Sequence, residues 1–406
     1  MNAPPIDLPE PLEQRLLLRV GEVLHRYGTP SHRLERLLQR VAAQLQLQAQ
    51  FLATPTSLIV SLGSGTREHT RLLRVHPGGS SNLGKLIELD ELLEDLEDGR
   101  CDVPRALERL EEIDASKGRY GAVASAAAFG MSAGCAAVFL GGGLWECLAA
   151  AVLGLLLFVL GLLVARSPER VDVSDAWLAF SAGLAGLAWN RWVVPVDYQI
   201  VTLSALIILI PGLSFTVAML ELATRHLVSG VARLAGAGAT MLTIVLGVAL
   251  AWRLGNEQLA GTVHRPLSDP VRYAIMAFAP MGFAVLFQVR VREWWVVYLA
   301  GLAGFFGSMA GVPILGPNLG PFVGALAVGL VGNTYARIFD RPSSLAHMPG
   351  ILLLVPGTVG YKALGLFLGD NPMEGTAQAF RMTMVGAALV GGLLTASAIL
   401  PPRRTL

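Results

Sequence analysis

Long apolar runs occupy the chain from about residue 120 to residue 400. A helix needs about 20 mostly apolar residues to cross the hydrocarbon core of a bilayer, and ten runs of that kind can be counted. The predicted spans are 120–140, 146–166, 174–193, 198–224, 229–253, 270–289, 294–312, 321–339, 348–369 and 375–400. The pattern therefore predicts an all-α polytopic membrane protein.

The residues before position 120 follow a different pattern. Apolar positions recur at helical spacing from Pro11 to Tyr27 and from Leu34 to Leu45, and two polar helices are expected near 85–98 and 103–115. Residues 56–62 and 70–75, on either side of a Gly-Ser-Gly turn, predict a β-hairpin. Residues 1–119 are thus expected to form a small α+β domain, the head.

The distribution of charge supports this boundary. Residues 1–119 carry 33 of the 61 charged residues. The whole chain is 53% hydrophobic and only 15% charged. Soluble domains are about 25% charged, so a large part of the chain must lie in lipid. The net charge of +1 gives no sign of nucleic-acid binding. Cys101, Cys135 and Cys147 form no CxxC pair, and no metal site or cofactor is expected.

Basic residues in the short loops predict the orientation. If the N-terminus is cytoplasmic, the inner loops and the C-terminal tail contain Arg166, Arg170, Arg225, Arg290, Arg292, Arg337, Arg341, Arg403 and Arg404. The outer loops at 141–145 and 313–320 contain no basic residue. The positive-inside rule therefore predicts that both termini, and the head, are cytoplasmic.

Two halves of the membrane part share spaced motifs. Pro211-Gly212 in the fourth span and Pro356-Gly357 in the ninth are 145 residues apart. Further positions match at an offset of 145 or 146, namely Gly183 with Gly329, Gly186 with Gly332, Arg191 with Arg337 and Gly230 with Gly375. We interpret 120–254 and 270–400 as homologous repeats of five helices. Because five is odd, the second repeat must enter the membrane inverted, as in many secondary transporters.

The two Pro-Gly pairs predict broken helices near the middle of the membrane. Proline removes a backbone donor and glycine lets the chain swing, and the half-helix that follows presents N–H groups suited to a carboxylate. A simple kink in a packed helix is the alternative, but the matched positions favour a site. The candidate substrate-binding residues are Pro211, Gly212, Ser214, Pro356, Gly357, Thr358, Lys362, Arg381 and Asn333.

Charged side chains within the spans are costly and indicate function. Lys362 and Arg381 could offset a substrate carboxylate, and Glu221 could carry a coupling proton if burial raises its pKa. The histidines of the head, at positions 25, 32, 69 and 76, are interpreted as structural or solvent-exposed, because no acidic residue has ligand spacing to them. For residues 313–321 a rigid hairpin is favoured over a loop that re-enters the bilayer.

Several short motifs resemble the threonine/serine exporter family. They are Gly21–Glu35, Phe51–Ser57, Leu209–Leu213 and Ser229–Leu234, followed by Gly316–Asn318, Arg341-Pro342 and Leu354–Gly357, which resemble the smaller partner that some members encode separately. The resemblance covers about residues 12–400. It implies secondary active export of threonine and serine across the bacterial inner membrane, driven by the proton gradient. Split relatives imply export of dicarboxylates such as succinate as an alternative.

Two other functional classes remain open from the sequence. A membrane-embedded hydrolase would use the histidines of the head, and a passive channel would need a ring of polar residues. The spans contain no nucleophile–base set, so an enzyme is not expected. The expected partners are an amino acid or carboxylate substrate, a proton or other coupling ion, the lipid bilayer, and, as an open alternative, further copies in a homo-oligomer.

Overall fold

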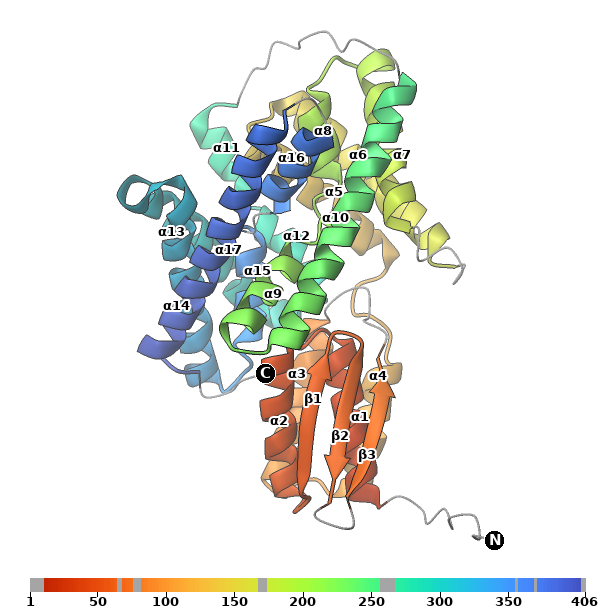
Figure 1. Ribbon diagram of the computed structural model, residues 1–406, viewed down its shortest axis with the longest axis vertical. Helices are drawn as coiled ribbons and strands as arrows, with labels where there is room; N and C mark the ends of the chain where they lie inside the picture. The colour runs from red at the N-terminus through yellow and green to blue at the C-terminus, as the bar shows by residue number, and fades with distance from the viewer. Residues whose placement is uncertain are drawn as a thin grey trace.

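The computed structural model describes residues 11–63, 68–75, 82–166, 174–255, 267–354, 357–368 and 371–402. A small α+β head lies at one end of a much larger bundle of helices (Figure 1). The head comprises α1 (Leu12–Arg26), α2 (Ser31–Gln44), β1 (Ala49–Thr54), β2 (Ser57–Leu62), β3 (His69–Arg74), α3 (Leu83–Glu97) and α4 (Val103–Ala115).

The three strands form an antiparallel sheet in the order β1-β2-β3. The predicted hairpin is confirmed, with Ile59 of β2 opposite Leu72 of β3. β1 was not predicted. Residues 55–56 form the two-residue turn that joins β1 to β2. Leu58, Val60 and Leu62 are buried, so one face of the sheet packs on the helices of the head.

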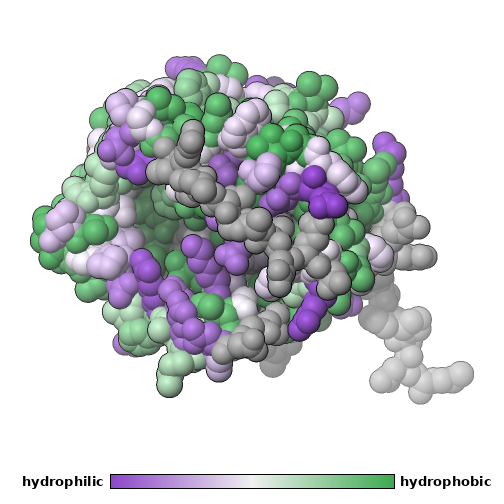
Figure 2. Space-filling model, turned by 90° about the horizontal axis from the view of Figure 1, so that it is seen from above, coloured by the Kyte–Doolittle hydropathy of each residue, from purple (hydrophilic) through white to green (hydrophobic). Residues whose placement is uncertain are grey.

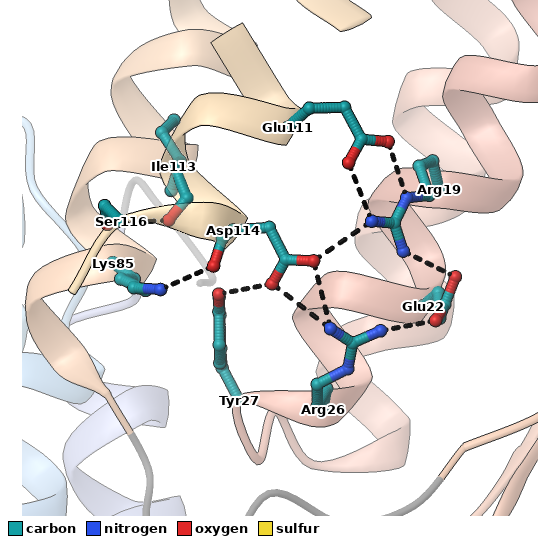
Figure 3. Close-up of polar contacts among 9 residues, drawn as sticks. All are labelled: Arg19, Glu22, Arg26, Tyr27, Lys85, Glu111, Ile113, Asp114 and Ser116. Carbon is teal, nitrogen blue, oxygen red and sulfur yellow. Dashed lines mark hydrogen bonds and ion pairs between the residues drawn. The ribbon is translucent and has the colours of Figure 1, made fainter. Parts of the chain in front are cut away.

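An ion-pair network joins α1 to α4 (Figure 3). The Asp114 carboxylate accepts hydrogen bonds from Arg19 (3.0 Å), from Arg26 (3.0 Å) and from the Tyr27 hydroxyl (2.8 Å). Arg19 also donates two bonds of 2.9 Å to Glu111. Because one carboxylate serves two donors from α1 and one from Tyr27, the residue that follows it, the network fixes α4 against α1.

The membrane part is built from helices of unequal length. They are α5 (Ala122–Phe139), α6 (Leu144–Val164), α7 (Ser174–Trp192), α8 (Tyr198–Ala205), α9 (Gly212–Ala223), α10 (Leu227–Gly255), α11 (Asp269–Met276), α12 (Ala279–Leu286), η3 (Val291–Glu293), α13 (Trp294–Leu319), α14 (Pro321–Phe339), α15 (Ser344–Leu352), α16 (Gly357–Leu368) and α17 (Pro372–Ile399). Among the described residues, seven helical segments are long and apolar enough to cross a bilayer. The chain is therefore a helical polytopic membrane protein.

Three of the predicted spans consist of two short helices each. The fourth span is α8 and α9, separated by the non-helical residues 206–211, and the ninth is α15 and α16. The sixth span is also broken, between α11 and α12 at Ala277-Phe278, which no sequence motif predicted. Pro356 lies outside the described residues.

Two of the broken spans, α8–α9 and α15–α16, run in opposite directions (Figure 1). α9 ends at the head, where the Glu221 carboxylate accepts a bond from the Ser31 N–H. α15 begins at the head, where Arg33 contacts His347. The chain thus approaches the head along α8–α9 and leaves it along α15–α16.

The predicted rigid hairpin over residues 313–321 is confirmed, because a Cβ on Gly311 would lie 2.4 Å from the Gly320 carbonyl oxygen and the chain therefore turns back between these two residues. α13 continues to Leu319, with one non-helical residue at Gly316, where φ is 80°. Glycine adopts this left-handed conformation at little cost, and Pro317 then starts a new helical turn, a position that proline favours. The prolines and glycines therefore produce a tight turn, after which α14 packs back along α13.

The head is held to the membrane part by a shared core. Leu83 and Ile87 belong to the same buried cluster as Phe283 and Phe287. The Leu83 N–H donates to the Phe287 carbonyl (2.9 Å). Beside this core, Arg290 donates two hydrogen bonds to Glu91, and Arg341 bonds the same carboxylate.

Candidate functional site

The two helix breaks meet in the interior of the membrane part. A Cβ atom placed on Gly357 would lie 3.3 Å from Gly212 Cα and 2.7 Å from Ile210 Cγ2. The first residues of α9 and α16 are therefore in contact, and a side chain at Gly357 would push the breaks apart. Helix N-termini carry positive partial charge, so both half-helices direct it toward this region.

A cavity of about 230 Å³ lies beside the meeting point. Ile207 from the first break and Leu352, Leu353 and Thr358 around the second are among its lining residues. The other walls come from α5, α11, α12 and α13 and are mostly apolar. Phe139 and Tyr273 place the cavity toward the end of the bundle away from the head. From that side the surface is hollowed, with hydrophobic walls and a hydrophilic rim (Figure 2).

Ser132 supplies a buried polar group to this cavity. Its side chain is 2% exposed, and its Oγ has no hydrogen-bond partner among the described residues. It was missed from the sequence because a serine in a stretch rich in glycine and alanine is an ordinary feature of helix packing. Among the cavity residues, the nearby Cys135 thiol already contacts the Ile275 carbonyl at 3.4 Å.

The structure brings together only some of the predicted site residues. Thr358 lines the cavity, Pro211, Gly212 and Gly357 form the two breaks, and Ser214 is half-buried in the first turn of α9. The other three polar candidates, Lys362, Arg381 and Asn333, are not among the lining residues.

Each of these three side chains has another position. Lys362 on α16 and Arg381 on α17 are exposed on the surface of the bundle. Asn333 is fully buried, and its Nδ2 donates to the Leu400 carbonyl (2.9 Å), which fastens the end of α14 to the end of α17. A span prediction says nothing of which way a side chain points around its helix, and this is why the three were grouped with the site.

Glu221 lies at the head end of α9 and is not a lining residue of the cavity. Its carboxylate is fully buried and accepts two hydrogen bonds from Arg233, at 3.0 and 3.2 Å. A third bond of 3.0 Å comes from the backbone N–H of Ser31, the first residue of α2. A carboxylate at a helix N-terminus is favoured electrostatically, so this contact helps to hold α2 against α9.

The histidines of the head differ in their surroundings. His25 and His32 are buried, which fits the structural alternative of the prediction, while His69 is exposed and His76 lies outside the described residues. Burial, together with the neighbouring Arg33, lowers the pKa of His32 to about 2, so its ring is neutral. Across the described part of the chain, no group of three or more metal-ligating side chains could hold an ion.

Seven membrane-length helical segments, two facing helix breaks and an interior cavity define a polytopic membrane transport protein. A family model for threonine/serine exporters matches residues 15–255, and a second model, "Threonine/Serine exporter, ThrE", matches residues 272–399. The chain belongs to the threonine/serine exporter family, and both halves of it are covered.

Fungal membrane proteins are among the curated relatives. "Pheromone-regulated membrane protein 10" of Yarrowia lipolytica is 26% identical over 366 residues, which are 85% of this chain and 30% of the relative. The proteins of the same name from Eremothecium gossypii and Candida albicans are 25% and 24% identical, over 86% and 89% of this chain and 48% and 34% of their own lengths. The chain thus spans about a third to a half of these relatives. No solved structure matches it.

Proposed function

We propose that the protein is a secondary active exporter of small neutral amino acids, with serine and threonine as substrates, and that its transport is coupled to protons. The observation that carries the proposal is the cavity that contacts both helix breaks, through Ile207 on one side and Leu353 and Thr358 on the other. Secondary transporters bind substrate where discontinuous helices of two repeats meet near the middle of the bilayer. The proposed substrate site is this cavity together with the starts of α9 and α16.

Packing between helices supports two inverted repeats, 120–254 and 270–400, behind a head of residues 1–119. A Cβ on Gly183 would lie 2.5 Å from Ala251 Cβ, and one on Gly329 would lie 2.4 Å from Ala396 Cβ. Likewise, Gly247 approaches Ala176 and Ala179, and Gly392 approaches Phe322 and Ala325. All these positions correspond at an offset of 145 or 146, the same as that of the sequence motifs. The opposite directions of α8–α9 and α15–α16 fit an inverted second repeat.

The lining of the cavity favours an amino acid over the alternative dicarboxylate. No Lys, Arg, Asp or Glu is among its described lining residues. The start of α16, at Thr358, offers partial positive charge to one carboxylate, and the end of α15, at Leu352 and Leu353, offers partial negative charge to an ammonium group. A dicarboxylate would bury a second negative charge with no counter-charge, which is costly.

Proton coupling is assigned to Glu221 as a proposal. Its carboxylate could take up a proton only if its ion pair with Arg233 opened, and the Ser31 N–H would then lose a charged acceptor. Protonation would therefore change how the end of α9 contacts the head. Such a link would join the proton to a movement of the broken helix.

We propose a multi-pass position in a plasma membrane, the inner membrane in a bacterium, with both termini cytoplasmic. Arg290 and Arg341 bond the head at Glu91, and Arg225 lies in the turn between α9 and α10 at the same end of the bundle. This clustering of basic residues around the head fits the positive-inside rule.

The test is efflux from proteoliposomes containing the full chain. Labelled serine, threonine, alanine and succinate would be measured with an imposed pH gradient, without one, and with a protonophore. We expect saturable amino-acid efflux that the gradient accelerates and the protonophore abolishes. Efflux of succinate alone would contradict the amino-acid assignment, and non-saturable flux that ignores the gradient would indicate a channel.

A further inference from the structure

We propose that the cavity receives the side chain of the substrate, and that the protein therefore also exports amino acids with larger apolar side chains, such as valine, leucine and methionine. The inference rests on the proposed function and extends the substrate class of the same site beyond serine and threonine. It is carried by the chemistry of the described lining, which is mostly apolar along the four helices α5, α11, α12 and α13.

Aromatic and aliphatic side chains form most of the cavity wall. Met276 on α11 and Leu302 on α13 supply flexible apolar surface. Six aromatic rings from the four helices also line the cavity, namely Phe139, Tyr273, Phe283, Tyr298, Phe305 and Phe306. An apolar group that enters such a pocket leaves water and gains contacts, whereas a polar group gives up hydrogen bonds to water. The wall therefore favours an apolar side chain.

Three of the five polar side chains in the described lining already face other groups. The Cys135 thiol contacts a backbone carbonyl of α11 at 3.4 Å, and the Tyr273 hydroxyl accepts a hydrogen bond from Arg272 at 3.2 Å. The buried Ser132 hydroxyl lies against α12, because a Cβ on Gly282 would be 2.5 Å from its oxygen. A substrate hydroxyl thus finds few partners in this wall, and serine gains little from entering it.

The helix breaks provide for the part that all amino acids share. Thr358 lies in the first turn of α16, where N–H groups and positive partial charge suit a carboxylate, and Leu352 and Leu353 lie at the end of α15, where carbonyl groups suit an ammonium group. A substrate held there would extend its side chain toward the aromatic walls. The cavity volume of about 230 Å³ is several times the roughly 30 Å³ of one water molecule in the liquid, so a side chain larger than that of serine has room.

The first experiment measures export of a homologous series by the full-length protein in proteoliposomes, with protein-free liposomes to correct for passive leak. Alanine, 2-aminobutyrate, norvaline and norleucine each differ from the next by one methylene. We expect kcat/KM to rise about fourfold with each methylene that enters the pocket. Valine should exceed threonine, which has the same shape but carries a hydroxyl in place of one methyl group.

The second experiment narrows the cavity from two different elements. Ala136→Phe on α5 and Ala277→Leu, directly after α11, enlarge residues that line the cavity. Each should lower the ratio of kcat/KM for norleucine to kcat/KM for alanine about tenfold, as for the lost burial of nearly two methylenes. Ala127→Phe, at an exposed position of α5 outside the described lining, is the matched control and should keep the wild-type ratio.

The possible outcomes separate this inference from the proposed function. Equal kcat/KM along the series in the wild-type protein, as expected if a lipid tail fills the apolar part of the cavity, would overturn the inference. Unchanged ratios in both narrowed variants would overturn it as well. A wild-type protein that exports none of the amino acids, serine and threonine included, would instead overturn the proposed function, so the two failures are distinguishable.

Discussion

The backbone N–H of Ser31 and the carboxylate of Glu221 are joined by a hydrogen bond of 3.0 Å, although 190 residues separate them in the chain. The bond connects the first residue of α2 in the head to the last turn of α9. The same helix contacts the other broken span, because Arg33 donates to Nδ1 of His347 on α15 at 3.2 Å. α2 thus touches both half-helices nearest the head.

The ion pair between Glu221 and Arg233 is expected to stabilise the contact of the head with α9. Glu221→Gln would leave Arg233 without its buried counter-charge and should lower the stability of the protein by about 3 kcal/mol. Arg233→Met in addition should recover part of the loss, which a double-mutant cycle on thermal unfolding in detergent would measure. Glu374→Gln, at an exposed position, is the control. Strictly additive effects of the two changes would contradict the pairing.

Gly357→Ala should impair transport by separating the two helix breaks. The added Cβ would lie 2.7 Å from Ile210 Cγ2, and overpacking of this kind costs about 1–3 kcal/mol. We expect efflux to fall at least tenfold (by roughly 1.4 kcal/mol or more) while membrane insertion is retained. Gly365→Ala on the same helix meets nothing within 4 Å and should export normally. Equal efflux by both variants would show that the breaks need not touch.

His32 makes the stability of the head depend on pH. Its pKa falls from 6.5 to about 2 because of burial and the nearby Arg33, so folding favours the neutral ring. The stabilisation is fully present above about pH 6.5 and is lost at roughly 1.4 kcal/mol per pH unit as the pH falls toward 2, since the unfolded chain then binds the proton.

The measurement for His32 is the thermal unfolding midpoint of the whole protein between pH 8 and pH 5. His32→Gln should flatten the dependence in this range. His69→Gln, at an exposed histidine, should leave it as in the wild type. A wild-type midpoint that does not fall toward pH 5 would count against a neutral buried His32.

Lys362 is expected to be dispensable for amino-acid export. Its side chain is exposed on α16 and is not among the residues that line the cavity, although its place after the break suggested a partner for a carboxylate. Lys362→Met should therefore keep kcat/KM for serine within about twofold of wild type, the scale of an ordinary surface change. If Lys362→Met selectively lowered the export of anionic substrates, Lys362 would belong to the substrate site.

The amino-acid pattern alone determined the membrane class, the head and the two central breaks. Apolar runs of bilayer length and the Pro-Gly pairs at 211–212 and 356–357 act locally, because lipid requires each segment to satisfy its own backbone hydrogen bonds. Amphipathic spacing in the first 119 residues likewise predicted α1, α2 and the β2–β3 hairpin. These features need no knowledge of the rest of the chain.

Only the tertiary structure decided which side chains meet. Lys362 and Arg381 lie in apolar segments but are exposed on the surface. Ser132 lies in a segment rich in glycine and alanine but is among the residues that line the cavity. Glu221 accepts a hydrogen bond from Ser31, which is 190 residues away in the chain. The rotation of each helix about its axis depends on neighbours that are distant in sequence, so hydropathy cannot specify it. The position of a residue along a span was therefore predictable, and its direction was not.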